Sequence, residues 1–170
     1  MEKTRRITAI LFIIYILYLI WAVLFKFSFS YAEIPYKRQY INWNLFYNPN
    51  SYLWSPVIIR EKIMNVLIFL PFGAYLYMLG ARRFISSFLI MLFTSILFEI
   101  IQYVFVLGTS DVTDVAANTI GGVTGYVLAY LTLMISKKEE KMTRHFTILS
   151  AVFTVVVISG TLLLKIGYLG

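Results

Sequence analysis

Residues 84–107 read FISSFLIMLFTSILFEIIQYVFVL, and among them Glu99 is the only residue that is charged at neutral pH. A helix that crosses the hydrocarbon layer of a membrane needs about 20 mostly apolar residues, because the layer is about 30 Å thick and each residue rises about 1.5 Å. The stretch meets that requirement. It therefore predicts a membrane-spanning α-helix.

The composition of the whole chain agrees with this prediction. The 170 residues are 60% hydrophobic and 14% charged, whereas a soluble domain is about 45–50% apolar and about 25% charged. A soluble globular protein is therefore excluded, and the length predicts a single membrane domain, residues 1–170. The chain has no cysteine and one histidine, His145, so we expect no disulfide, no thiolate site, no metal centre and no cofactor.

Four further stretches are apolar enough to span a membrane. With the first stretch they predict an all-α integral membrane protein, a bundle of five transmembrane helices at about 7–27, 63–79, 84–107, 112–135 and 146–164. Pro71 and Gly73 indicate a kink or a locally opened turn in the second helix. The first apolar run is longer than the 7–15 residues, roughly, of a signal peptide, so we expect a retained anchor.

The distribution of lysine and arginine predicts the orientation. Basic residues cluster before the first helix, between the second and third, and between the fourth and fifth, and such residues stay in the cytoplasm. We therefore expect a cytoplasmic N-terminus and an external C-terminus. The net charge of +7 follows from this topology and from anionic lipid headgroups. Without a basic aqueous domain we expect no nucleic-acid partner.

The first external loop, residues 28–60, is rich in tyrosine and tryptophan interleaved with asparagine. Aromatic residues of this kind favour the headgroup zone, so we expect the loop to lie at the outer interface. The loop and its edges also carry cations, which either contact outer-leaflet phosphates or anchor the helix ends. These residues are Lys26, Lys37, Arg38, Arg60 and Lys62.

Polar side chains inside the predicted helices gather at one end. Inserting an ionisable residue into hydrocarbon costs about 2.5–3.5 kcal/mol on insertion scales, so the presence of Glu99 in this helix indicates a specific role. Gln102 follows on the same helical face, and the predicted topology places polar residues of the second and fourth helices in the same leaflet. We infer a polar pocket that opens outward or laterally, with Arg60 as a counter-ion. The candidate ligand-binding residues are Asn65, Glu99, Gln102, Asp111, Asp114, Asn118, Arg60 and Glu61.

Some of these residues also have a structural interpretation, and the two interpretations stay open. Asp111 is a suitable N-cap, and Asp114 falls in the first helical turn, where a carboxylate complements the helix dipole. Asn118 would hydrogen-bond to another helix. The same helix has small residues at four-residue spacing, which let helix backbones approach closely. The predicted packing residues are Ala117, Gly121, Gly125 and Ala129.

Five segments of the chain resemble the VanZ family. They are LIWAVLFK at 19–26, NVLIFLPFG at 65–73, FEIIQ at 98–102, DVTDV at 111–115 and NTIGG at 118–122. The resemblance implies a multi-pass protein of the bacterial cytoplasmic membrane that is associated with low-level resistance to the lipoglycopeptide teicoplanin. The motif residues that carry it include the polar residues of the inferred pocket.

Three hypotheses follow for the pocket. We favour a non-enzymatic protein that binds a lipid-linked headgroup, such as a cell-wall precursor, or the acylated drug. The second hypothesis is an intramembrane enzyme acting on a lipid or cell-wall precursor, with Glu99 or Asp114 as general base or as ligand to a hard divalent cation. The third is a small lipid or proton-coupled transporter that uses Glu99. Membrane lipids are the expected partners, and the oligomeric state is left open.

Overall fold

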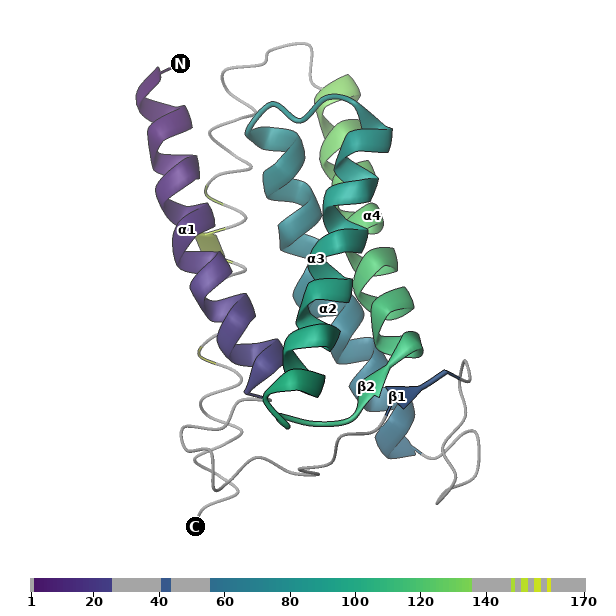
Figure 1. The fold of residues 1–170 in the computed structure, drawn as a ribbon. Helices are drawn as coiled ribbons and strands as arrows, with labels where there is room; N and C mark the ends of the chain where they lie inside the picture. The colour runs from purple at the N-terminus through teal and green to yellow at the C-terminus, as the bar shows by residue number, and fades with distance from the viewer. Residues whose placement is uncertain are drawn as a thin grey trace.

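The computed structural model describes residues 2–25, 41–43 and 56–135, together with positions 148, 151, 152, 155, 156 and 159. Within these residues the fold is a bundle of long helices with one short strand pair (Figure 1). The elements are α1 (Glu2–Leu24), β1 (Ile41–Asn42), α2 (Pro56–Met78), α3 (Phe84–Val104), β2 (Ser110–Asp111) and α4 (Val112–Ile135). The fifth expected helix, 146–164, falls mainly outside the described residues.

Most of the described long helices, though not α2, have the length and composition of membrane spans. Three of them, over Arg5–Leu24, Phe84–Val104 and Val112–Ile135, are long and apolar enough to cross a membrane. Large apolar side chains such as Leu17 and Phe93 are each 63% exposed on the outside of the described bundle. Lipid can solvate such a surface, whereas water would penalise it. The chain is a membrane protein.

Several helix boundaries differ from those predicted, among them the start of α1, which is Glu2 instead of about residue 7. α2 begins at Pro56, so the end of the expected loop 28–60 is helical. The hydropathy criterion excluded that turn because it contains Arg60-Glu61-Lys62, but charged residues are good helix formers and proline is favoured at the first helical position. The first helix likewise ends at Leu24 instead of residue 27. The helix α2 also continues through Pro71.

The third helix ends at Val104 and not at the expected residue 107. The cause is a backbone turn in which Val106 has φ 54° and the amide of Leu107 donates to the carbonyl of Gln102 at 2.9 Å. This pattern is a Schellman motif, which satisfies the last helical carbonyls, and its left-handed position usually belongs to glycine. Hydropathy does not detect such a turn, because the residues that form it are as apolar as the helix.

Helices α2 and α4 run in the same direction and make the most extensive contact in the described bundle (Figure 1). Glycines make this approach possible. A Cβ added at Gly121 would overlap the carbonyl of Val66, and one at Gly125 would overlap the carbonyl of Leu70. All members of the small-residue stripe are buried, namely Ala117, Gly121, Gly125 and Ala129.

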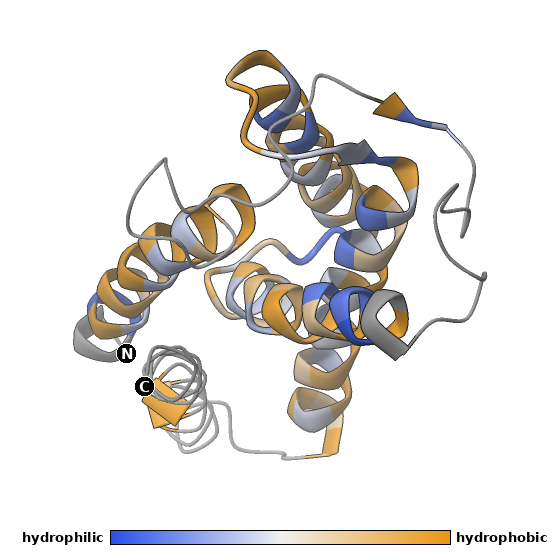
Figure 2. Ribbon diagram, turned by 90° about the horizontal axis from the view of Figure 1, so that it is seen from below, coloured by the Kyte–Doolittle hydropathy of each residue, from blue (hydrophilic) through white to orange (hydrophobic). Residues whose placement is uncertain are grey.

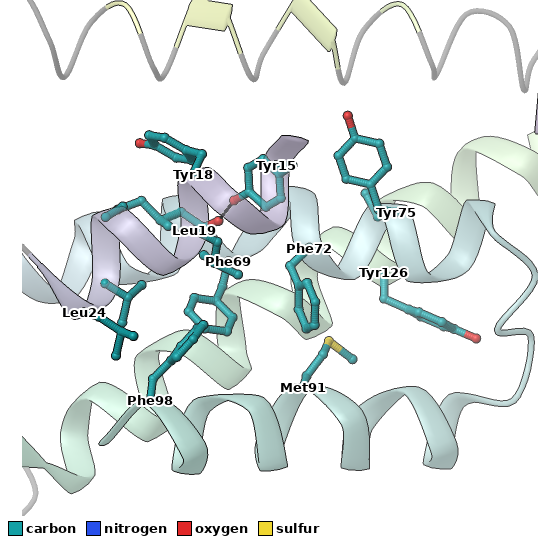
Figure 3. Packing of buried hydrophobic residues seen from close by; sticks show 14 of the residues in the cluster. Tyr15, Tyr18, Leu19, Leu24, Phe69, Phe72, Tyr75, Met91, Phe98 and Tyr126 are labelled. Carbon is teal, nitrogen blue, oxygen red and sulfur yellow. Dashed lines mark hydrogen bonds between the residues drawn. The ribbon is translucent and has the colours of Figure 1, made fainter. Parts of the chain in front are cut away.

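Helix α1 packs differently, through aromatic side chains. Tyr15 and Tyr75 are fully buried, with ring centroids 5.7 Å apart, and Phe69 packs edge to face against Phe98 of α3 at 6.1 Å. The Tyr15 hydroxyl donates to the carbonyl oxygen of Ile68 (Figure 3). The core is thus built around α2. Helix α4 packs closely against one side of α2, and α1 packs against the other side through aromatic side chains.

The two ends of the bundle differ in character. At one end, Arg5 donates to the carbonyl of Leu79 at 3.4 Å, and Arg82 lies 4.3 Å from the ring centroid of Tyr77. The start of α2, the end of α3, the start of α4 and both strands lie at the opposite end (Figure 1). The basic residues expected in the cytoplasm before the first helix and after the second therefore share one end, and the polar residues singled out above lie at the other.

Candidate functional site

A lysine on α2 bridges two aspartates at the start of α4. Lys62 Nζ lies 2.9 Å from Asp111 Oδ2 and 2.5 Å from Asp114 Oδ1. Asn65 Nδ2 donates to the same oxygen of Asp114 at 2.7 Å. Lys62 and Asn65 are three residues apart and so lie on one helical face. The exposed fractions of the Lys62 and Asp114 side chains are 16% and 7%, so solvent screens this pair only weakly.

Asp111 both caps α4 and contacts Lys62. Its Oδ1 accepts a hydrogen bond from the backbone amide of Thr113 at 2.8 Å, which makes it the N-cap of α4 and satisfies one of the free amides of the first turn. Its Oδ2 remains for Lys62. The N-cap prediction is confirmed, and the cap fixes the carboxylate in place for the ion pair.

Glu99 ties the end of α3 to the connection that follows it. Its Oε2 accepts the backbone amide of Asp111 at 2.8 Å, and its carbonyl oxygen accepts the hydroxyl of Ser110 at 2.6 Å. Strand β1 pairs in parallel with this connection, with Ile41 opposite Ser110. A segment from the expected interfacial loop therefore lies beside the polar residues, and Trp43, which follows β1, is 73% exposed.

Gln102 lies three residues after Glu99 on α3 and reaches α1. Its Nε2 donates to the carbonyl of Val23 at 2.8 Å, a carbonyl in the last turn of α1 that has no partner within its own helix. The residue is 2% exposed. Its Oε1 is buried and has no hydrogen-bond partner among the described residues.

These side chains surround a cavity of about 200 Å³. The view from this end of the bundle shows hydrophilic turns on the inner sides of the helix ends and hydrophobic turns around them (Figure 2). Carboxylates and amides form the polar part of the lining, and α1 and α2 supply the apolar part. The lining residues are Ala22, Val23, Glu61, Met64, Asn65, Ile68, Glu99, Gln102 and Asp114.

Most of the predicted site residues lie at this cavity. Five of them line it directly, namely Glu61, Asn65, Glu99, Gln102 and Asp114, and Asp111 is joined to it through Lys62. Asn118 does not line it. That residue is fully buried, and its Nδ2 donates to Ser95 Oγ on α3 at 2.9 Å, the interhelical hydrogen bond that the sequence predicted.

The cation at the site is Lys62, which the sequence analysis did not include among the site residues. Arg60, the expected counter-ion, is exposed. A signal for Lys62 was present, because it precedes Asn65 by three residues and therefore shares its helical face, whereas Arg60 precedes Asn65 by five.

The donor set indicates what the cavity can hold. Among the described residues, no group of three histidine, cysteine, aspartate or glutamate side chains is arranged to hold a metal ion. The buried Oε1 of Gln102 is the acceptor of this lining that has no hydrogen-bond partner among the described residues.

Comparison with known proteins identifies relatives over the same region. Residues 12–135 match the family model described as VanZ/LLP1, a range that contains every residue lining the cavity. The chain is also 37% identical over 117 residues to Protein VanZ of Enterococcus faecium, and this alignment covers 68% of each chain. No solved structure matches the chain.

Proposed function

Because the chain belongs to the VanZ family, we propose that it is a multi-pass protein of the bacterial cytoplasmic membrane that lowers susceptibility to teicoplanin. The proposed orientation has the N-terminus in the cytoplasm. This orientation agrees with the common position of Arg5 and Arg82 at one end of the bundle, because basic residues near spans stay inside. The cavity then opens in the outer leaflet.

The proposed activity is binding of a lipid-linked headgroup in this cavity. One observation carries it: the cavity gathers three carboxylates and two amides at one end of an otherwise apolar bundle. Polar groups at membrane depth are costly, and where they occur they commonly face a site or a pathway. The lining also suits an amphiphile, because Val23, Met64 and Ile68 can contact the part of the ligand next to the acyl chains.

The size of the cavity favours a headgroup over the intact drug. Sites for drug-sized ligands have volumes of roughly 300–1,000 Å³, whereas this cavity has about 200 Å³. A headgroup of several heavy atoms fits such a volume, but a glycopeptide with several sugars and rings does not. The proposal is therefore that the protein binds an envelope lipid and thereby reduces the access of the acylated drug to the outer surface.

Resistance measurements with a near-isosteric variant test this proposal. The Glu99→Gln variant keeps an oxygen that can accept the amide of Asp111, yet it removes a carboxylate from the cavity. Cells that express the wild-type chain should show a raised minimal inhibitory concentration of teicoplanin, and cells with Glu99→Gln should lose most of that increase. The matched control is Thr132→Val, an exposed position near the other end of α4.

Vancomycin, which lacks the acyl chain, serves as the comparison drug, and immunoblots of membrane fractions establish that each variant is inserted at equal amounts. Full teicoplanin resistance in a properly inserted Glu99→Gln variant would refute the proposal that the cavity is responsible for resistance.

The orientation can be tested separately, because the chain contains no cysteine. A single cysteine placed at Trp43 should react with a membrane-impermeant maleimide in intact cells, and one placed at Arg82 should react only after the cells are opened. The reverse labelling pattern would place the cavity in the inner leaflet and contradict the proposal.

A further inference from the structure

The side chain of Gln102 has a buried amide oxygen, Oε1, without a hydrogen-bond partner among the described residues. Its amide nitrogen donates to the carbonyl of Val23 at 2.8 Å, and because a carbonyl only accepts, this contact fixes which end of the amide is nitrogen. Gln102 and Val23 both line the cavity, so the amide group that joins them lies in its wall. A buried acceptor without a donor costs free energy. A ligand in the cavity can supply that donor.

The two buried carboxylates of the lining are already paired. Asp114 accepts hydrogen bonds from Lys62 and Asn65, and Glu99 accepts the backbone amide of Asp111. A cationic ligand would have to compete with these contacts. The hydrogen-bonding capacity that the site leaves to a ligand is therefore that of a neutral amide and not that of a free carboxylate.

An anionic ligand does not suit the lining either. Glu61, Glu99 and Asp114 all contribute carboxylates to it, and Glu61 at its exposed edge also has an interaction partner. Like charges repel most strongly where solvent is excluded. A ligand group that enters this space and donates a hydrogen bond to Gln102 is therefore uncharged.

Asn65 distinguishes between the two common neutral donors, a hydroxyl and an amide. Its side-chain nitrogen carries two N–H groups, and the contact with Asp114 uses one of them. A hydroxyl oxygen donates and accepts at the same atom, so that one such group can donate to Gln102 and accept from Asn65. An amide needs two separate atoms for these contacts and hence more room.

We infer that the cavity binds the hydroxyl group of a neutral polyol, recognised by Gln102 Oε1 and Asn65 Nδ2. This inference rests on the proposed function and specifies the chemical class of the headgroup. A cavity of about 200 Å³ holds several heavy atoms, since a water molecule in the liquid occupies about 30 Å³. The glycerol end of a diacylglycerol or part of a sugar headgroup fits this space, with its acyl chains outside.

Two lipids that differ only in the hydroxyl test the inference. Purified full-length protein in phosphatidylcholine nanodiscs would be titrated with diacylglycerol and with its deoxyfluoro analogue, and binding followed by native mass spectrometry. Fluorine is no larger than the hydroxyl it replaces and donates no hydrogen bond, so a difference in affinity cannot come from lack of room. We expect diacylglycerol to bind roughly 5- to 10-fold more tightly, the effect of one hydrogen bond.

A soluble polyol separates the two sources of the hydroxyl group. If methyl glucoside displaces diacylglycerol, the site accepts a hydroxyl from water, as on a saccharide, and if it does not, the hydroxyl must be part of a membrane lipid. Either result retains the neutral hydroxyl as the ligand group.

Two variants connect the binding to Gln102. Gln102→Met keeps the length of the side chain but removes the acceptor, and it should abolish the preference for the hydroxyl lipid. Ser95→Ala is the matched control, because it also removes a buried hydrogen bond of α3 but is not among the described lining residues. It should keep the preference. The comparison of the two lipids on the wild-type protein needs no variant and holds even if Gln102→Met fails to fold.

The outcomes separate this inference from the proposed function. Equal affinity for the two lipids, or binding of neither, would overturn the hydroxyl assignment and leave the binding of another headgroup intact. Retention of the preference by Gln102→Met would overturn the role of its amide oxygen. If the preference is found but Glu99→Gln leaves teicoplanin resistance unchanged, only the link between this site and resistance fails.

Discussion

Replacing Lys62 with methionine should destabilise the bundle strongly, because it removes the cation from between two carboxylates. The substitution keeps an unbranched side chain of similar length. It leaves Asp114, whose side chain is 7% exposed, without the ammonium group 2.5 Å away, and it leaves Asp111 without its contact at 2.9 Å. Asp114 keeps the hydrogen bond from the amide of Asn65 at 2.7 Å.

These contacts set the expected magnitude. Breaking a buried ion pair by removing one partner costs about 3–5 kcal/mol. The low end applies here, because Asn65 still hydrogen-bonds to Asp114 and the Lys62 side chain is 16% exposed, so that water can reach part of the site. We expect the free energy of unfolding to fall by about 3 kcal/mol.

A double-mutant cycle measures the pair itself. Lys62→Met, Asp114→Asn and the double variant would be unfolded in bicelles by titration with dodecyl sulfate, and the coupling energy taken from the four values. Neutral interhelical hydrogen bonds in a membrane couple by about 0.6 kcal/mol on average. The ion pair should exceed this and reach about 2 kcal/mol, since it joins opposite charges at short distance.

Arg60→Met is the matched control for the loss of a positive charge on α2. Arg60 is exposed and lies two residues before Lys62, so its replacement should change the stability by about 0.5 kcal/mol at most. The reasoning fails if the two methionine variants cost the same. It also fails if the effects of Lys62→Met and Asp114→Asn simply add.

Three other substitutions test separate features of the fold, each by the same unfolding titration. Gly125→Ala should cost about 1–3 kcal/mol, because its Cβ would overlap a carbonyl of α2, whereas Thr124→Ala on the exposed face should cost little; equal losses would contradict the close contact of α2 and α4. Val106→Gly should stabilise the protein by about 1 kcal/mol, since a β-branched residue at φ 54° is strained, whereas Ile100→Gly, at an exposed position inside α3, should destabilise it by about 1 kcal/mol; a loss at both positions would show that contacts of the Val106 side chain outweigh the strain. Tyr75→Phe should raise stability by about 1 kcal/mol, because the buried hydroxyl has no partner among the described residues, and a clear loss would mean that the hydroxyl is bound.

Apolar length and helical spacing explain what could be predicted from the sequence. The fourth helix was expected at 112–135 and is α4, with the same bounds, because capping and hydropathy agree there. The burial of Glu99 and Gln102 also follows from simple spacing, since both belong to an apolar helix and lie three residues apart. Patterns that repeat along one helix can be found without any knowledge of its neighbours.

The features that were missed depend on contacts between elements. The choice between Arg60 and Lys62 as the cation is decided by the position of α4 relative to α2, which no local pattern encodes. Similarly, the pairing of Ile41 with Ser110 joins two short segments with no strand periodicity. Asn118 has the spacing of a pocket residue, but its helix directs it toward Ser95, outside the cavity.

The ion pair between α2 and α4 also bears on how the chain is made. Lys62 and Asp114 are separated by 52 positions in the sequence, so a ribosome has completed α2 and α3 before Asp114 emerges. Until then, the membrane must accommodate α2 while Lys62 lacks both of its aspartate partners. Helix α2 is also not among the helices that are apolar enough by themselves to span a membrane. We therefore expect α2 to reach its final position late in biogenesis, after the first turn of α4 has been synthesised.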